Sequence, residues 1–244
     1  MSTACVIIIG NEILSGRTQD VNLNWLAVEL NKAGVRLREA RVIPDVPEAI
    51  IKTVNECRAT YDYVFTTGGI GPTHDDITSQ CISQAFGRKH VRNPEVVAMF
   101  NTHYGPEKVN EARLRMCDMP EGAVLIPNPV SVAPGFQVEN VYVMAGVPGI
   151  MRAMFDHVKS GLKGGKPVQS ATVSTYLTEG TIAKELTDVQ NQFEDVEIGS
   201  YPFMRDGKLG TSLVARSDDE KRLGLTKDAL TAMIKTFGGE IIAE

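Results

Sequence analysis

Residues 61–78 read YDYVFTTGGIGPTHDDIT, a segment that by itself predicts an α/β fold. Its first half is an aromatic and β-branched run, which is typical of a strand buried on both faces. The strand leads directly into a turn that contains Gly68, Gly69 and Gly71. A helix is expected after this turn, beginning between residues 73 and 75 and ending near residue 86. A strand, a glycine-rich turn and a helix in this order form the building unit of parallel sheets.

The same alternation of strand and helix extends on both sides of this segment. Strands are predicted at residues 4–9, 36–43 and 140–145, in addition to 62–67. Helices are predicted at residues 21–33, 45–58, 94–103, 107–116 and 148–158, with Gly34 ending the first of them. This order predicts a doubly wound, mostly parallel sheet whose ligand sites lie at the carboxyl ends of its strands.

The last third of the chain has a different pattern. Residues 160–167 are rich in glycine and lysine, a composition typical of a linker. Strands are predicted beyond it at 169–177, 195–202, 208–216 and 240–243, and helices at 179–191 and 223–237. Asp206-Gly207 is a hairpin turn signal between the middle strands. The order β-α-β-β-α-β predicts a small ferredoxin-like α+β domain at 168–244, after a first domain at 1–163.

Composition restricts the classes of partner. Of the 244 residues, 43% are hydrophobic and 23% charged, which is ordinary for a globular protein, and the net charge of −5 disfavours nucleic acid. No apolar run reaches the roughly 20 residues of a membrane-spanning helix, so no membrane partner is expected. The apolar start of the chain has no basic region before it and is interpreted as a strand, so we expect a cytoplasmic location.

The four cysteines show no spacing that suggests a disulfide framework or a zinc site. They are Cys5, Cys57, Cys81 and Cys117. Cys57 and Cys81 are in phase with apolar neighbours at helical spacing, and we expect both to be small core residues.

The glycine-rich turn predicts a phosphate site. Glycine permits positive φ values and a close approach of the backbone, so that consecutive N–H groups can point at one anion. The following helix would add its own N–H groups and the positive end of its dipole. Asp75 and Asp76 would repel an anion, unless a divalent cation such as Mg²⁺ lies between them and the phosphate.

Two alternatives need no ligand. Thr73 and Asp76 fit a helix capping box, and Asp45 fits a cap for the helix that contains Glu48. A capping box does not require the preceding glycines, so the phosphate site is favoured for this loop. For Asp45 the sequence leaves capping and metal binding open.

Residues 67–78 resemble the Thr-Gly-Gly-(Ile/Leu)-Gly-Pro-Thr-x-Asp-Asp-(Ile/Leu)-Thr signature of the CinA family, in its MoaB/Mog-type molybdopterin-binding domain. Further landmarks of the family lie before and after this signature, in the order in which they occur in the family, at residues 10–16, 20–26, 120–123, 133–136 and 146–151. The last 75 or so residues resemble the small domain that follows in CinA. The resemblance implies a MoaB/Mog-like sheet. Because no amidohydrolase domain follows, deamidation of nicotinamide mononucleotide is not expected.

The resemblance also implies a ligand and site residues. MoaB/Mog domains bind molybdopterin and some adenylylate it, whereas CinA-type domains are described as metal-dependent pyrophosphatases of ADP-ribose or related dinucleotides. The implied metal (Mg²⁺, Mn²⁺ or Co²⁺) is held by Asp76 with Glu12 and Asp45, and Asp75, Asp76 and Asp45 are candidate catalytic residues. The expected ligand-binding residues are Asn11, Thr67, Gly68, Gly69, Gly71, Pro72, Thr73, Thr78, Asn128, Pro134 and Gly135. The expected partners are a small phosphorylated ligand and a second copy of the chain, most simply in a dimer.

Three departures from the family pattern keep several functions open. Asn11 stands where many relatives have Asp, Ile150 stands where many have Glu, and residues 113–117 replace an Asn-x-x-Gln-Ala stretch. The first hypothesis is a metal-dependent pyrophosphatase. The second is a pterin-binding or pterin-adenylylating protein of molybdenum cofactor biosynthesis. The third is a regulatory binding module without turnover, which the missing carboxylates would fit.

Overall fold

The computed structural model describes residues 2–242, and these form two compact units. The first unit ends at Gly165 and the second begins at Lys166. The end of the predicted strand at 240–243, Ala243, lies outside the described residues. No helix within residues 2–242 is long and apolar enough to cross a membrane.

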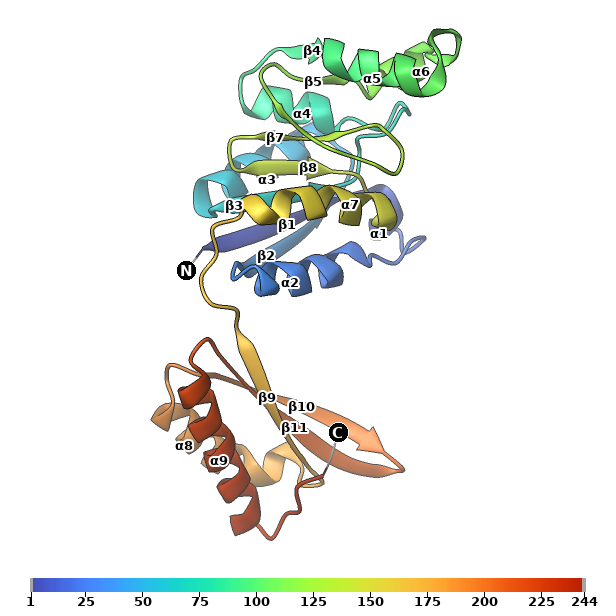
Figure 1. Ribbon diagram of the computed structural model, residues 1–244. Helices are drawn as coiled ribbons and strands as arrows, with labels where there is room; N and C mark the ends of the chain where they lie inside the picture. The colour runs from blue at the N-terminus through green and yellow to red at the C-terminus, as the bar shows by residue number, and fades with distance from the viewer. Residues whose placement is uncertain (1, 243–244) are drawn as a thin grey trace. The chain divides into compact units, whose positions relative to one another are not determined.

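A six-stranded sheet forms the centre of the first unit, with strand order β2-β1-β3-β8-β7-β6 (Figure 1). The strands are β1 (Thr3–Ile9), β2 (Arg36–Ile43), β3 (Tyr63–Thr67), β6 (Val124–Ile126), β7 (Gly135–Val138) and β8 (Val141–Met144). β2, β1, β3 and β8 are parallel, whereas β7 and β6 continue the sheet in antiparallel pairing. The predicted mostly parallel sheet is therefore confirmed.

Both faces of this sheet are buried, because successive residues of β1 enter two different cores. Cys5, Ile7 and Ile9 pack with α3 (Pro47–Thr60), α4 (Thr78–Ala85) and α5 (Pro94–Tyr104). Val6 and Ile8 pack with α2 (Asn22–Lys32) and α7 (Pro148–Val158) on the other face. Burying each large aliphatic side chain contributes about 1.5–3 kcal/mol, which stabilises β1 as an inner strand between β2 and β3.

Several short elements of the first unit were not predicted. They are α1 (Asn11–Leu14), β4 (His90–Arg92), β5 (Asp118–Pro120), β6 and β7. Each has only three or four residues, which is too short to show a period in the sequence. Between α5 and β5 lie the 3-10 turn η1 (Pro106–Lys108) and α6 (Glu111–Arg115), where a single helix at 107–116 was predicted.

The four cysteines are free and buried, as expected for Cys57 and Cys81. The sequence did not reveal that Cys5 and Cys57 are neighbours, with their Sγ atoms 3.5 Å apart.

The second unit is a three-stranded antiparallel sheet with strand order β10-β11-β9. Its elements are β9 (Gln169–Thr175), α8 (Glu179–Gln192), β10 (Glu197–Arg205), β11 (Lys208–Ser217) and α9 (Glu220–Thr236). Asp206 and Gly207 both have positive φ, as the predicted hairpin turn requires. The predicted fourth strand is represented by one antiparallel bridge, from Ser174 to Ile242. This order and pairing are those of the predicted ferredoxin-like unit.

Part of the glycine-rich segment predicted as a linker is packed against the first unit. The 3-10 turn η2 (Lys159–Gly161) extends α7. Beyond it, the Gly165 N–H donates to Gly34 O at 2.8 Å. A Cβ at Gly164 would lie 1.7 Å from Ala33 O, so glycine is needed here for a close approach of two backbone segments.

Candidate functional site

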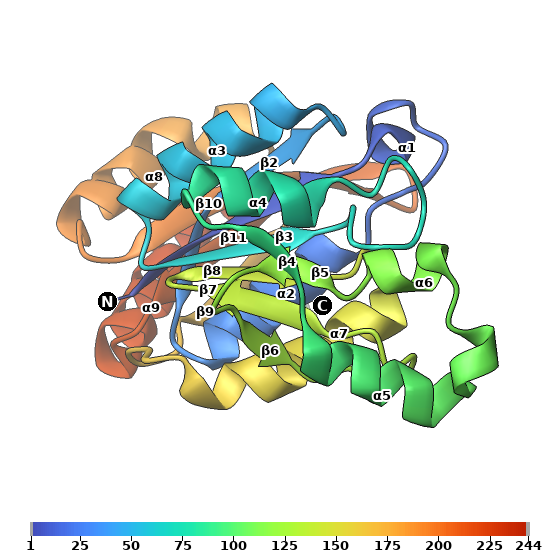
Figure 2. The same cartoon turned by 90° about the horizontal axis from the view of Figure 1, so that it is seen from above.

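Two loops lie at the carboxyl edge of the parallel strands, where the sequence predicts ligand sites. The loop after β1 contains α1, and the loop after β3 extends from Gly68 to Ile77, just before α4. Figure 2 shows both loops and α6 at this edge of the sheet. Because β1 and β3 are parallel neighbours, residues that are distant in the sequence meet here.

Hydrogen bonds hold the start of the loop after β3 both to β8 and to the other end of the loop. The Gly68 N–H donates to Met144 O at 3.2 Å, and the Thr78 N–H donates to Gly69 O at 3.0 Å. The Thr78 hydroxyl donates to Gly68 O at 3.1 Å. Gly68 and Gly69 have φ values of 104° and 67°, a region that favours glycine. At Gly68 a Cβ would also lie 2.2 Å from Ile9 O, so the turn needs glycine for two reasons.

The predicted start of the next helix between residues 73 and 75 is wrong, because α4 begins at Thr78. The contacts of Thr78 with Gly68 and Gly69 hold the preceding backbone in a loop. Asp76 still reaches back: its carboxylate accepts from the Thr73 N–H at 2.8 Å and from the Thr73 hydroxyl at 2.5 Å. The side-chain bond expected of a capping box is therefore present, but it closes a turn and not a helix.

Three consecutive backbone N–H groups in the middle of this loop have no partner. Those of Gly69, Ile70 and Gly71 donate to no group in the part of the chain that the structure describes. Adjacent unpaired N–H groups in a turn form a site suited to an anion. Gly68 was expected to contribute its N–H as well, but that group is bound to Met144 O.

These N–H groups belong to the wall of a cavity of about 380 Å³. Glu12, from the loop after β1, and Asp76 give this wall two carboxylates. Each carboxylate lies close against a glycine: a Cβ at Gly10 would lie 2.5 Å from Glu12 Oε1, and a Cβ at Gly71 would lie 2.6 Å from Asp76 Oδ2. The missing Cβ atoms leave room for both carboxylates beside the backbone.

One part of the cavity wall is apolar. Met116, Val147, Ile150 and Met154 line it. From the sequence, Ile150 was singled out only because many relatives carry Glu at this position. The structure places Ile150 in this apolar part of the wall. Its apolar neighbours were not predicted, since their residue type alone indicates a core position.

The predicted site residues divide into two groups. Those that line the cavity are Glu12, Gly68, Gly69, Gly71, Pro72, Asp76 and Asn128. Asn128 offers no free group to a ligand, because its amide nitrogen donates to Ser131 Oγ and Ala133 O, and its amide oxygen accepts from two backbone N–H groups. Asn128 therefore shapes the wall.

Several other predicted residues lie away from the cavity wall. Thr67 and Thr78 are buried, with exposed fractions of 1% and 0%, and the Thr78 hydroxyl holds the loop. Thr73 is bound to Asp76, and its hydroxyl also lowers the pKa of the neighbouring Asp75 carboxyl below the usual range. The Asp75 side chain is exposed and points to solvent beside His74, with Nδ1 and Oδ1 4.0 Å apart.

Pro134 and Gly135 have separate places. Pro134 lines a smaller adjoining void of about 20 Å³. Gly135 is buried in β7, where a Cβ would lie 2.4 Å from Val143 O. Gly135 thus serves strand packing.

Asp45 is bound to the loop after β1. Its Oδ2 atom accepts from the Asn11 N–H at 2.8 Å, at the start of α1. Of the two explanations left open by the sequence, the structure shows a capping bond, but to α1 and not to α3, whose first turn has no side-chain cap. Neither Asn11 nor Asp45 lines the cavity.

The three carboxylates expected to share a metal do not form one cluster. Within residues 2–242, the only group of three potential ligand atoms that lie within 4.8 Å of one another comes from the buried Cys5 and Cys57 and the partly exposed Glu39. Glu12 and Asp76 share the cavity, whereas Asp45 is bound to Asn11.

Comparisons with known proteins cover both units. Residues 5–163 match the family described as "Probable molybdopterin binding domain", and residues 167–238 match "FAD synthase, middle domain". A protein of Pyrobaculum calidifontis is 38% identical over 83% of this chain and 81% of its own length. The "Probable FAD synthase" of Caenorhabditis elegans is 32% identical over 98% of this chain, which spans 51% of that relative. The motifs of residues 67–78 and of the other family landmarks did not indicate a likeness to FAD synthases.

The first unit is also similar to a solved structure. The crystal structure of CinA from Thermoplasma acidophilum, described as being of unknown function, superposes with a TM-score of 0.62 and 31% identity. The match covers 66% of this chain and 97% of that one. Together with the family match over residues 5–163, it shows that the chain belongs to the molybdopterin-binding domain family, as a member of the CinA type.

Proposed function

We propose that the first unit hydrolyses the pyrophosphate bond of an ADP-ribose-like compound or a dinucleotide, with the help of a divalent metal. The observation that carries this proposal is one cavity wall that combines unpaired backbone N–H groups with two carboxylates, Glu12 and Asp76. N–H groups bind phosphate oxygens, and carboxylates bind the hard divalent cations that accompany phosphates in proteins. One water molecule is consumed, the bridging P–O bond breaks, and two monophosphates leave.

In this proposal the N–H groups of Gly69, Ile70 and Gly71 bind and orient one phosphoryl group. Glu12 and Asp76, the two carboxylate residues of the cavity wall, hold the metal. When bound, the metal neutralises phosphate charge and polarises the phosphorus for attack by water. Asp45 and Asp75 have no role at the metal, because one is bound to the Asn11 N–H and the other points to solvent.

The apolar wall supports a ligand with a planar ring. Met116, Val147 and Ile150 pack against the base, so a dinucleotide gains affinity beyond that of its phosphate groups by burying apolar surface. The relatives named as FAD synthases support an adenine dinucleotide such as FAD among the substrates. The chain spans about half the length of these relatives. That FAD is a substrate of this chain is therefore proposed here from the likeness.

A screen for AMP release tests the function. ADP-ribose, FAD and NAD are incubated with the protein and Mg²⁺, Mn²⁺ or Co²⁺ in turn. We expect AMP from at least one substrate, and no AMP after chelation of the metal. Binding of these compounds without AMP release under any metal would contradict the hydrolase and favour a binding module.

The description of the matching family favours a second candidate, a pterin-binding or pterin-adenylylating protein. A cavity of about 380 Å³ with an apolar wall also suits a pterin and its phosphate. Titration with molybdopterin, followed by fluorescence, distinguishes the two: tight pterin binding without dinucleotide hydrolysis would replace the first candidate.

We further propose that the protein forms a homodimer, because a pocket at the edge of a sheet often gains a wall from a second subunit. Light scattering at micromolar concentration checks this, and a monomeric mass would contradict it.

A further inference from the structure

The cavity wall has an excess of negative charge that one metal ion does not offset for a pyrophosphate ligand. Glu12 and Asp76 are its charged residues, and a pyrophosphate adds further negative charge. A divalent cation between the carboxylates and one phosphoryl group leaves the second phosphoryl group without a counter-charge. In a partly enclosed site, such an uncompensated charge is unfavourable.

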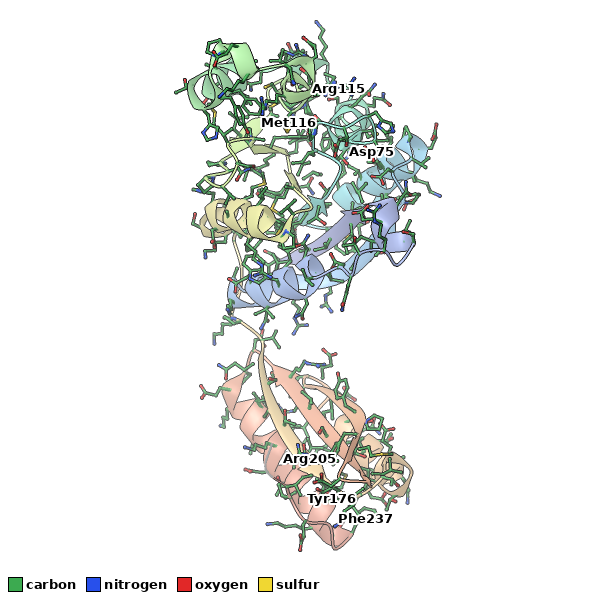
Figure 3. The ribbon with its side chains drawn as sticks, turned by 90° about the vertical axis from the view of Figure 1, so that its right-hand side faces the viewer. Asp75, Arg115, Met116, Tyr176, Arg205 and Phe237 are labelled. Atoms are coloured by element: carbon green, nitrogen blue, oxygen red, sulfur yellow. The ribbon has the colours of Figure 1, made fainter. Side chains whose placement is uncertain are left out.

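Arg115 lies next to this wall. It is the last residue of α6, and it lines the void of about 20 Å³ that adjoins the cavity. The two spaces share Ile70, Gly71, Asp76 and Met116. Figure 3 shows Arg115 and Met116 in the same part of the first unit as Asp75, from the loop before α4. Arg115 therefore approaches the anion-binding loop from the side of α6.

The guanidinium of Arg115 is not neutralised by a neighbour. It makes no ion pair or hydrogen bond with the residues that the structure describes, and its side chain is exposed. Asp118 lines the same small void, but Arg92 already binds both of its oxygens, at 2.9 and 3.2 Å. Arg115 is thus the one cationic side chain among the described residues that line either space.

Arg113, two residues earlier, has a different environment. Its guanidinium stacks on the Tyr104 ring at 4.3 Å from the centroid and donates to Lys108 O. Two arginines of the same short helix therefore differ in one respect: the guanidinium of Arg113 is engaged by Tyr104 and Lys108 O, away from both spaces, whereas that of Arg115 has no partner among the described residues. This difference provides a matched control.

We propose that Arg115 binds the second phosphoryl group of the ligand, the one that the backbone N–H groups and the metal do not hold. A guanidinium offers a planar pair of donors that matches two phosphate oxygens and carries a permanent charge. The stretch that departs from the family pattern, residues 113–117, would then supply the cation of the site. This inference rests on the proposed function and adds one residue that binds the ligand of that site.

Binding of two inorganic probes tests the assignment without any turnover. Pyrophosphate and orthophosphate are titrated by calorimetry in excess Mg²⁺ into the wild-type chain and the variants Arg115→Ala, Arg115→Lys and Arg113→Ala. We expect Arg115→Ala to weaken pyrophosphate binding about ten-fold, which is about 1.4 kcal/mol, and orthophosphate binding less than about two-fold. Arg115→Lys should recover part of the lost pyrophosphate affinity, since lysine keeps the positive charge but not the planar pair of donors. Arg113→Ala should bind both probes like the wild type, with its folding checked by thermal melting.

Three results would overturn the assignment: equal weakening of both probes by Arg115→Ala, the same losses in Arg113→Ala, or no pyrophosphate binding by the wild type. Absence of AMP release together with the expected binding pattern would contradict the hydrolase alone, because calorimetry of the probes requires no hydrolysis.

Discussion

The loops after β1 and β3 begin alike but differ in whether their backbone N–H groups can bind a ligand in the cavity. Each starts with a glycine at the carboxyl end of a parallel strand, and in each a carboxylate binds a backbone N–H: Asp45 binds that of Asn11, and Asp76 binds that of Thr73. In the β1 loop, some further N–H groups are used internally, such as that of Ser15 to Asn11 O, whereas those of Gln19, Asp20 and Val21 have no partner among the described residues but belong to residues outside the cavity lining. In the β3 loop, three adjacent N–H groups stay unpaired among the described residues.

The difference shows that a carboxylate beside a glycine turn does not identify a site. What distinguishes the β3 loop is that its unpaired donors belong to residues that line the cavity, because only unpaired donors within reach of a ligand can bind an anion. The contribution of Glu12 from the β1 loop then depends on its sharing the cavity with these donors. Matched substitutions in the two loops test this contrast.

The largest effect is expected from Gly68→Ala. The new Cβ would lie 2.2 Å from Ile9 O at a φ of 104°, and we expect a loss of about 3 kcal/mol or more in the free energy of unfolding. The control in the other loop is Gly16→Ala, at a φ of 73° with no atom within 4 Å of the new Cβ, which should lose about 1 kcal/mol. Urea denaturation measures both, and equal losses would contradict the account of crowding at Gly68.

The next effect concerns the two aspartates. Asp76→Asn keeps an acceptor for the Thr73 N–H but removes the charge that a metal needs, so metal-dependent AMP release should fall about ten-fold or more, about 1.4 kcal/mol, with a nearly unchanged melting temperature. Asp45→Asn should change AMP release less than about two-fold. A melting temperature several degrees lower for Asp76→Asn, with normal metal and ligand binding, would show that Asp76 serves only the turn.

A smaller effect is expected from the buried hydroxyl of Thr78. Thr78→Val keeps the shape and removes the donor to Gly68 O, which should cost about 1–2 kcal/mol of folding stability. The matched change in the β1 loop, Ser15→Ala, removes an exposed bond to Glu12 O at 3.2 Å and should stay within about 0.5 kcal/mol. Loss of ligand affinity in Thr78→Val without loss of stability would restore the sequence-based role of Thr78 as a ligand.

The smallest effect is expected at Asp75, a catalytic candidate on sequence grounds. Its side chain points away from the cavity, so Asp75→Asn should leave kcat and KM for AMP release within about two-fold of the wild type. A ten-fold fall in kcat would show that Asp75 takes part in the reaction and would contradict its orientation toward solvent.

Much of the architecture could be predicted because its signals are local. The alternation of buried residues in β1, the glycine that ends α2 and the Asp206-Gly207 turn each act within a few residues. The start of α4 could not be predicted, because Thr73 and Asp76 carry the local pattern of a cap. Contacts of Thr78 with Gly68 and Gly69, across the whole loop, outweigh that pattern.

The candidate site divides in the same way. The sequence by itself determined that residues 67–78 form a glycine turn after a buried strand, since that follows from side-chain size and backbone freedom along one segment. Only the tertiary structure decided which carboxylates and donors face one another. Asp45 is bound to the Asn11 N–H and does not line the cavity, whereas Asp76 lines the cavity with Glu12 and the adjoining void with Arg115. The physical reason is that hydrogen bonds and cavities depend on distances between segments, which no local pattern specifies.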